Sequence, residues 1–505
     1  MAFGDIRVAE RADWLIERIG AVGSVVLCKA GETRAGEMAA HRFLSSRYVS
    51  TEAIVATLAA RTAAQCRGRH ILAAQDTSEV NFSGRDKKRR GLGPGGDGKA
   101  PGFFIHPVIA VDIESEAIIG LVDAHIWTRP KRKQNRRSRP FEEKESARWV
   151  TAHKVAAERL AEAASLVMVG DREADIYEVF AERPARSDLI VRAAQDRCLS
   201  DDDGKLFAAV AEAPRLVTTK VRVKPRKPGE KERIAEVELR AAIVSIARPA
   251  DRPRGSTSDS VTMTYVEARE VNPPKGTKQP LLWRLLTTLP ATKAEQAIEI
   301  VNLYRLRWRI EEVFRALKKD GLGLEKTQVI DADRLFKLTA ISLAAAIRTM
   351  QLVDARDGSE RPISDVIDES FLEALRRLSR KLEGATEKQK EPAPATLGQL
   401  CQLDRRTARR LELLLWKARS QDHAQWMAAA RDNARRISPC YSCGISVNPV
   451  AARGGLGVRC AVTELPSHVP ESAKRAKSLV HLYSGRLLIS CRSPHASGRH
   501  RRKGP

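Results

Sequence analysis

Hydrophobic residues recur at helical spacing at the start of the chain and at strand spacing further on. Apolar positions three to four residues apart predict short helices around residues 11–19, 38–44 and 51–58. From residue 69 short apolar runs replace this pattern, as is typical of buried strands. We therefore predict a helical module over residues 1–68, followed by a domain built on a β-sheet.

The domain predicted over residues 69–355 mixes strands and helices. Three strands come first, then a helix, a strand, a helix and a strand, which indicates a mixed α/β sheet. The strands are expected at 71–76, 104–111, 117–126, 165–170 and 188–192, and the helices at 145–164 and 175–181. Further strand-like runs at 217–223, 234–239, 261–266 and 281–286 predict a β insertion over about 205–290.

Helical periodicity returns after the insertion. The pattern favours one helix over 291–319 and another over 331–354. Weaker helical patterns at 363–383, 396–418 and 421–436 predict a helical C-terminal region over 356–436. The last segment, 437–505, is basic and shows no sustained periodicity, so no fold is assigned to it.

The charge of the chain narrows the class of partner. The 88 Lys and Arg against 63 Asp and Glu give a formal net charge of +25, which predicts a polyanionic partner, most simply nucleic acid. Most of the excess lies in the basic segments 85–90, 129–139, 222–233 and 437–505. The run 129–139 holds seven basic residues and no acid. It predicts a loop on the phosphate backbone, with a merely solvated loop as the alternative.

Composition indicates a cytoplasmic, nucleoid-associated protein with no membrane partner. Asp5, Glu10 and Asp13 do not fit a secretion signal, and no apolar stretch approaches the ~18 residues that span a bilayer. The eight Cys in 505 residues form no disulfide framework. Cys440 and Cys443 have the spacing of half a zinc site, but a second pair at the required spacing is absent.

Three acidic residues lie where an active site can form. Asp76 and Asp171 each end a predicted strand, and ligands gather at the carboxyl ends of strands in α/β sheets. Glu311 lies on the helix predicted over 291–319. Three carboxylates without a His or Cys cluster suit a hard cation such as Mg²⁺. For each Asp alone, capping of the next helix is the alternative.

The helix around Glu311 carries a polar stripe beside its apolar face. At about 100° per residue, four polar side chains fall within a sector of about 60°. The members of the stripe are Tyr304, Arg307, Glu311 and Lys318. Glu312 points away from the stripe, so Glu311 is the better candidate metal ligand. A solvated face with salt bridges is the alternative interpretation.

The stripe matches a known signature. Its spacing, Tyr-x₂-Arg-x₃-Glu-x₆-Lys, resembles that of bacterial insertion-sequence DDE transposases, specifically the family-four insertion sequences. The stretch Asp171-Arg-Glu-Ala-Asp-Ile176 is similar to their second-aspartate motif, and Asp76-Thr-Ser78 to the first. Trp283 resembles the family tryptophan that stabilises a flipped base, with a tryptophan buried in the β insertion as the alternative. The likeness covers roughly residues 10–355.

Further residues are assigned to DNA. The stretches 41–44 and 49–54 resemble the family's N-terminal end-recognition module, which makes His41 and Arg42 candidate DNA-binding residues. Arg192 ends a predicted strand and is also a candidate, with an ordinary surface arginine as the alternative.

The resemblance implies an RNase-H-like core and a chemistry. Asp76, Asp171 and Glu311 would hold two Mg²⁺ ions, for which Mn²⁺ can substitute. Three members of the stripe would bind phosphates that flank the cut, namely Arg307, Lys318 and Tyr304. Trp283 would stack on a base extruded in a hairpin intermediate.

The function that the resemblance implies is cut-and-paste DNA transposition. A homodimer would bind the terminal inverted repeats, excise the element by hydrolysis and transesterification, and join it to double-stranded target DNA. Residues 356–436 would serve dimerisation. Two alternatives stay open, an RNase-H-like Mg²⁺ nuclease without strand transfer and a catalytically inactive relative that binds DNA as an inhibitor.

Overall fold

The structure, a computed structural model, describes residues 5–361 with short gaps. Undescribed within that range are 83–88, 97, 99, 131–138, 201–203, 224–232, 253–256, 275–276, 278–279, 319–320 and 356–360. Several predictions therefore lie outside the described residues: most of the basic runs 85–90, 129–139 and 222–233, the helical patterns between 363 and 436, and the tail with Cys440 and Cys443.

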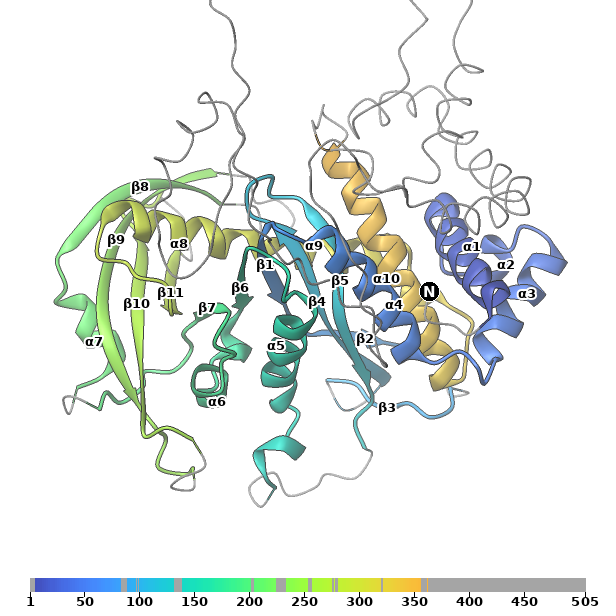
Figure 1. Cartoon of the computed structure of the whole chain (residues 1–505), viewed down its shortest axis with the longest axis horizontal. Helices are drawn as coiled ribbons and strands as arrows, with labels where there is room; N and C mark the ends of the chain where they lie inside the picture. The colour runs from blue at the N-terminus through green and yellow to red at the C-terminus, as the bar shows by residue number, and fades with distance from the viewer. Residues whose placement is uncertain are drawn as a thin grey trace, which may run out of the picture. The chain divides into compact units, whose positions relative to one another are not determined.

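A single mixed sheet organises the α/β part (Figure 1). Its central strands are β1 (His70–Gln75), β4 (Pro101–Asp112), β5 (Ile118–Trp127), β6 (Ser165–Gly170) and β7 (Asp188–Arg192). β1 pairs antiparallel with β4 and parallel with β6, β4 pairs antiparallel with β5, and β6 pairs parallel with β7. The resulting order β5-β4-β1-β6-β7 confirms the predicted mixed α/β class and is compatible with an RNase-H-like core.

The strands predicted as an insertion continue the same sheet. They are β8 (Arg215–Val223), β9 (Arg233–Ala247), β10 (Ser260–Glu270) and β11 (Leu282–Thr287), each antiparallel to the next. β11 also pairs antiparallel with β7, with Leu286 opposite Val191. This pairing places Trp283 and Arg192 at one end of neighbouring strands. The elements that escaped prediction include β2 (Ser78–Asn81), β3 (Gly93–Pro94) and α7 (Leu206–Ala211).

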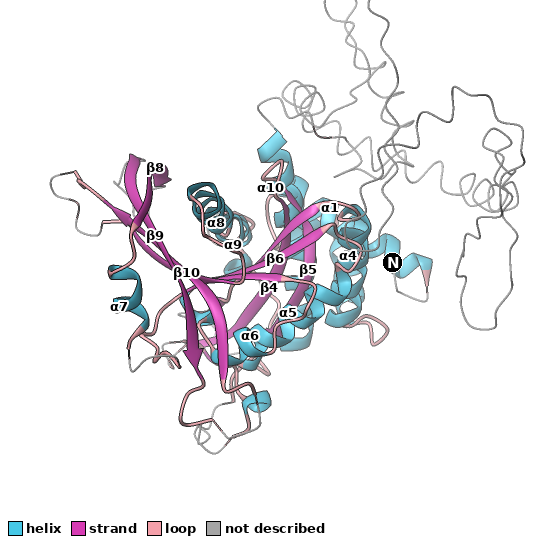
Figure 2. Cartoon of the chain, turned by 60° about the vertical axis from the view of Figure 1, so that its left-hand side comes forward, coloured by secondary structure: helices cyan, strands magenta, loops and turns pink. Residues whose placement is uncertain are grey.

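Successive side chains of a strand point to opposite faces of the sheet, and a hydrophobic core forms on each face. In β1, Leu72 and Ala74 belong to the core of the C-terminal helices, whereas Ile71 and Ala73 belong to the opposite core. The first face is covered by α8 (Ala294–Leu306), α9 (Trp308–Leu317) and α10 (Ala332–Ala355), and the second by α5 (Ala147–Arg159) and α6 (Tyr177–Ala181). Figure 2 shows α8 on one side of the sheet and α5 and α6 on the other. Burial on both faces explains the nearly continuous apolar runs in β6 and β7.

The predicted N-terminal helices are present, together with a short helix at Leu27–Ala30 that the pattern did not predict, and all of them share the first core. They are α1 (Ile6–Val22), α2 (Leu27–Ala30), α3 (Arg34–Ser45) and α4 (Thr51–Gln65). Asp5 caps α1, and the hydroxyl of Ser50 accepts from the backbone N–H of Ala53 at the start of α4. α1 packs on α10, and α4 packs on both α10 and β5 (Figure 1).

The single helix predicted over 291–319 is wrong, because the chain forms two helices there. The backbone N–H of Arg307 donates to the carbonyl of Tyr304, a tightened turn that separates α8 from α9. α9 ends at Leu317, and Lys318 is extended (φ −88°, ψ −157°). A Cβ at Gly321 would lie 1.9 Å from the carbonyl oxygen of Ala316, so glycine is needed where the chain turns back onto the helix.

The expectation that no apolar stretch approaches membrane-spanning length was too strict. By length and composition α10 could span a bilayer. However, 61% of its apolar 18-residue stretch is buried inside the protein. Its contacts with α1, α4, α9 and β5 make it a core helix. No other helix in the described residues is long and apolar enough to span a bilayer.

Candidate active site

Asp76 and Asp171 lie at one edge of the sheet because their strands are parallel neighbours. Ala74 of β1 stands opposite Val169 of β6, so the residues that follow the two strands emerge together. The backbone N–H of Thr77 donates to Oδ1 of Asp76 (2.7 Å) and fixes its orientation.

A tight turn carries Asp171 away from β6. The backbone N–H of Ala174 donates to the carbonyl of Asp171 (2.9 Å), which closes a short 3₁₀ turn over Arg172–Ala174. A Cβ at Gly170 would lie 2.5 Å from the Cβ of Ala174. The residue before Asp171 must therefore be glycine for this turn to close.

Glu311 reaches the same place from the first turn of α9. Arg307 stands among the three carboxylates: its Nη1 lies 2.8 Å from Oδ2 of Asp76 and 3.4 Å from Oε1 of Glu311, and its Nη2 lies 3.8 Å from Oδ2 of Asp171. Arg307 is only 8% exposed. One buried guanidinium thus gathers three acids from three separate elements. Glu312 pairs instead with Arg309.

A second layer of side chains surrounds Asp171. The hydroxyl of Tyr304 donates to Oδ1 of Asp171 (3.2 Å), and Nη1 of Arg192 lies 3.7 Å from the same oxygen. Arg192 also donates to the carbonyl of Leu282 (3.2 Å) at the start of β11. The next residue, Trp283, meets the ring of Tyr304 edge to face, with 5.2 Å between centroids and 70° between planes. The structure therefore places Arg192 beside Asp171 and Trp283 against Tyr304, which itself contacts Asp171.

The two aspartates differ electrostatically. Burial raises the pKa of Asp76 to about 7, helped by the charges of Glu311 and Asp171 and opposed by Arg307. Burial acts the same way on Asp171, but the guanidinium groups of Arg307 and Arg192 outweigh it and lower its pKa. Burial, reinforced by Asp171, raises the pKa of Tyr304 to about 12, so Tyr304 stays neutral and able to donate.

A match to a known protein family includes most of the residues of this site. Residues 104–347 match the family described as the transposase DDE domain. The match covers slightly less than half of the chain and supports a DDE transposase, a protein of DNA transposition and recombination. It contains Asp171, Trp283, Arg307 and Glu311, and it begins after Asp76.

DDE transposases generally use divalent metal ions, and the donor chemistry of this site fits them. Asp76, Asp171 and Glu311 offer only carboxylate oxygens, the ligands preferred by Mg²⁺ and Mn²⁺. Among the described residues, no three His, Cys, Asp or Glu side chains are arranged as a ready-made metal site. In this structure the guanidinium of Arg307 stands where the three carboxylates converge.

The remaining residues that the sequence assigned to the site are Lys318, His41 and Arg42. Lys318 has left the helix, and burial lowers its pKa while the charges of Glu325, Glu79 and Glu311 act in the opposite direction. His41 lies on α3, where its Nδ1 is 2.7 Å from Nη2 of Arg334 on α10. Arg42 is exposed in the last turn of α3. The assignment of His41 and Arg42 to DNA rests on the sequence resemblance alone.

Sequence reasoning missed the residues that connect the two aspartate turns. Arg148, in the first turn of α5, donates both to Thr77, next to Asp76, and to Glu173, two residues after Asp171. Glu173 was visible within the motif over 171–176, but its partner was not. Arg148 is one of 88 basic residues, and no spacing pattern distinguishes it from the others.

Proposed function

We propose that this protein is a cut-and-paste DNA transposase of the insertion-sequence kind that carries the Tyr-Arg-Glu-Lys signature. One observation carries the proposal: Asp76, Asp171 and Glu311, from three separate elements, converge on Arg307. Such a convergence of distant acids is expected of a metal-dependent phosphoryl-transfer site. The match to the transposase DDE domain supports the same class.

In this proposal the three acids hold two Mg²⁺ ions, with Mn²⁺ as a substitute. The ions would stabilise charge on the attacking and leaving oxygens of the phosphodiester. Tyr304 orients Asp171 through its hydroxyl. Arg192 and Arg307 place positive charge on both sides of Asp171 and bind the phosphates that flank the cut, together with Lys318.

Trp283 gives the site a surface for an unstacked base. Its ring stands against Tyr304, whose hydroxyl contacts Asp171. A base extruded from a DNA hairpin can therefore stack on Trp283 within reach of the carboxylates, for about 1–3 kcal/mol. The proposal includes excision through hairpin ends, followed by strand transfer into double-stranded target DNA.

End recognition is assigned to residues 1–68, with His41 and Arg42 as contacts, and dimerisation to residues 356–436. A homodimer would bring two transposon ends together, with one Asp-Asp-Glu site for each end. The cytoplasm, in contact with the nucleoid, is the proposed location. The formal net charge of +25 supports a DNA partner.

The test uses the purified chain and DNA that carries the inverted repeats flanking its gene. Asp76→Asn, Asp171→Asn and Glu311→Gln should each abolish Mg²⁺-dependent cleavage and leave end binding unchanged. Glu312→Gln is the matched control, because Glu312 pairs with Arg309 away from the three acids. Cleavage that persists in any of the three variants would contradict the assignment.

The same experiment separates the alternatives. Joining of 3′ ends to target DNA identifies a transposase, whereas cleavage without joining identifies a nuclease. End binding without cleavage by the wild-type protein identifies an inactive relative. The ion pairs that hold all three acids together favour the active enzyme.

A further inference from the structure

Arg148 stands between the two turns that carry the candidate metal ligands. It belongs to the first turn of α5, on the face of the sheet opposite α8 to α10. Its side chain is 13% exposed, and its guanidinium lies 5.4 Å from the ring centroids of both Trp127 and Trp149. These rings and the start of the helix restrict where the guanidinium can point.

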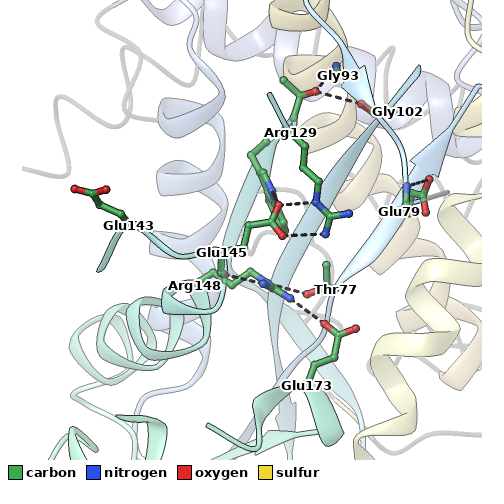
Figure 3. A network of polar contacts seen from close by, with 12 residues as sticks. Thr77, Glu79, Gly93, Gly102, Arg129, Glu143, Glu145, Arg148 and Glu173 are labelled. Carbon is green, nitrogen blue, oxygen red and sulfur yellow. Dashed lines mark hydrogen bonds and ion pairs between the residues drawn. The ribbon is translucent and has the colours of Figure 1, made fainter. Parts of the chain in front are cut away.

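Three nitrogens of Arg148 bind three different segments of the chain (Figure 3). Nε donates to Oγ1 of Thr77 (3.0 Å), in the turn after β1. Nη2 donates to Oε2 of Glu173 (2.9 Å), in the turn after β6. Nη1 donates to the carbonyl of Glu145 (2.7 Å), which closes the contact back to α5. One planar group thus ties both aspartate turns to the same helix.

On the Asp76 side, the contact continues into a buried chain of hydrogen bonds. Oε1 of Gln75 accepts from Nε2 of His106 (3.2 Å), so Nδ1 of the neutral imidazole is an acceptor. Thr77 therefore donates its hydroxyl proton to Nδ1 of His106 (2.9 Å) and uses a lone pair to accept from Arg148. The backbone N–H of Thr77 holds Asp76, so this chain fixes the carboxylate.

On the Asp171 side, Arg148 holds a turn that would otherwise project into solvent. The side chain of Glu173 is 67% exposed, and Arg148 is its ion-pair partner at 2.9 Å. Glu173 is the middle residue of the 3₁₀ turn that begins directly after Asp171. A shift of the turn at Glu173 relative to the turn at Thr77 would change the separation of the two aspartates.

A second ion pair holds Glu145, whose backbone carbonyl accepts from Arg148. The carboxylate of Glu145 accepts two hydrogen bonds from Arg129, at 2.7 and 2.9 Å, and one from the indole of Trp127 at 3.1 Å. Arg129 also lies over the ring of Phe104, 3.9 Å from its centroid. Figure 3 shows Arg129 and Glu145 joined to Arg148 in one network. The end of β5 and the start of α5 are held together by it.

We propose that Arg148 is a positioning residue that sets the separation of Asp76 and Asp171 for divalent-metal binding. It acts through Thr77 and Glu173 and touches neither carboxylate in the contacts described. The inference rests on the proposed function, since it assigns a metal-binding role to the two aspartates. Groups that orient metal ligands typically change metal affinity by about 10–100-fold when removed.

The test is calorimetric titration of the full-length, DNA-free protein with Mn²⁺. Arg148→Gln should weaken Mn²⁺ binding about tenfold or more. Arg148→Lys should recover only part of it, because an ammonium cannot reproduce the fork to Thr77 and Glu173. Thr77→Val should also weaken Mn²⁺ binding. The double variant Arg148→Gln/Thr77→Val should lose less Mn²⁺ affinity than the product of the two single losses.

Arg159→Gln is the matched control for general damage to α5. Arg159 lies on the same helix and pairs with Asp123 at 2.7 Å, away from the aspartate turns. It should lose thermal stability without losing Mn²⁺ affinity. Equal Mn²⁺ affinity in Arg148→Gln and Arg159→Gln would overturn the proposal, and so would a loss of end binding by Arg148→Gln with Mn²⁺ affinity intact.

Asp76→Asn separates the failure of this inference from failure of the proposed function. If Asp76→Asn loses Mn²⁺ binding and Arg148→Gln retains it, the metal site stands and only the role of Arg148 is wrong. If Asp76→Asn binds Mn²⁺ like the wild type, the metal site itself is wrong and both proposals fall.

Discussion

Nη1 of Arg307 lies 2.8 Å from Oδ2 of Asp76, and the same guanidinium also pairs with Asp171 and Glu311. In the DNA-free protein Arg307 is therefore the cation that the three acids share, and Arg192 adds a second positive charge beside Asp171. A divalent ion bound by these acids would compete with Arg307 for the same oxygens. Release of Arg307 toward a DNA phosphate would then accompany metal binding.

Replacing Arg307 tests this balance. Arg307→Met leaves three neighbouring carboxylates without their shared cation, which should lower the free energy of unfolding by about 2 kcal/mol in EDTA. This is less than for a fully buried pair, because Asp171 and Glu311 keep some access to water. Mg²⁺ should restore part of the loss, and urea denaturation with and without Mg²⁺ measures it.

Arg309→Met is the control for this experiment. Arg309 lies two residues from Arg307 and pairs with Glu312 of α9 and Asp354 of α10. Its loss should therefore destabilise the protein to a degree that Mg²⁺ does not change. A deficit in Arg307→Met that is equal with and without Mg²⁺ would show that the acids do not form a common metal site.

The strand pattern predicted the part of the site that depends on parallel neighbours. β6 and β7 begin and end where the apolar runs do. Once Asp76 and Asp171 follow adjacent parallel strands, their proximity is a consequence of the sheet. The signature spacing then added Tyr304, Arg307 and Glu311, which lie on the helices α8 and α9 and at the turn between them.

The rest depended on information that periodicity does not contain. A helical projection assumes uniform geometry, so it missed the tightened turn at Arg307 and kept Lys318 on a helix that ends one residue earlier. The chain reversal at Gly321 is a backbone contact with Ala316, which no side-chain pattern reveals. Arg148 and Thr77 are 71 positions apart in sequence, and only the assembled sheet brings them together.

Trp283 is predicted to act at the hairpin step and not at the first cut. Trp283→Ala should leave first-strand nicking nearly unchanged and reduce hairpin formation by the equivalent of about 1–3 kcal/mol of lost stacking. Trp283→Phe should retain most of the activity, because it keeps an aromatic face beside Tyr304. Gel assays on labelled transposon ends resolve the two steps. An equal loss in nicking and hairpin formation would indicate a structural role.

Gly170 is predicted to be needed because of one close approach. A Cβ at this position would lie 2.5 Å from the Cβ of Ala174, so Gly170→Ala should displace the turn that carries Asp171. We expect a loss of about 1–3 kcal/mol in the free energy of unfolding, as for overpacking in a core. Adding Ala174→Gly should recover part of it. If the double variant is no more stable than Gly170→Ala, the contact with Ala174 is not the cause.

His153 is predicted to make the fold sensitive to acid. Its buried ring donates from Nε2 to the hydroxyl of Ser187 (2.8 Å), which in turn donates to the carbonyl of Pro184 (2.9 Å). Burial, helped by the charge of Arg183, lowers the pKa of His153 from 6.5 to about 3. The neutral form is therefore the one that the fold requires.

The sign of the effect follows from proton uptake. Below pH 6.5 the unfolded chain binds a proton at His153 that the folded protein takes up only near pH 3, so stability falls as the pH drops through this window. The slope of unfolding free energy against pH that His153 contributes approaches about 1.4 kcal/mol per pH unit.

His153→Gln keeps a donor for Ser187 but cannot be protonated. Urea denaturation between pH 6.5 and 4.5 should therefore show a free energy of unfolding that changes less with pH than that of the wild type. His70→Gln is the matched control, since exposed His70 makes a similar bond to Ser165 (2.9 Å) at the surface. Parallel profiles for the wild type and His153→Gln would refute the buried neutral histidine.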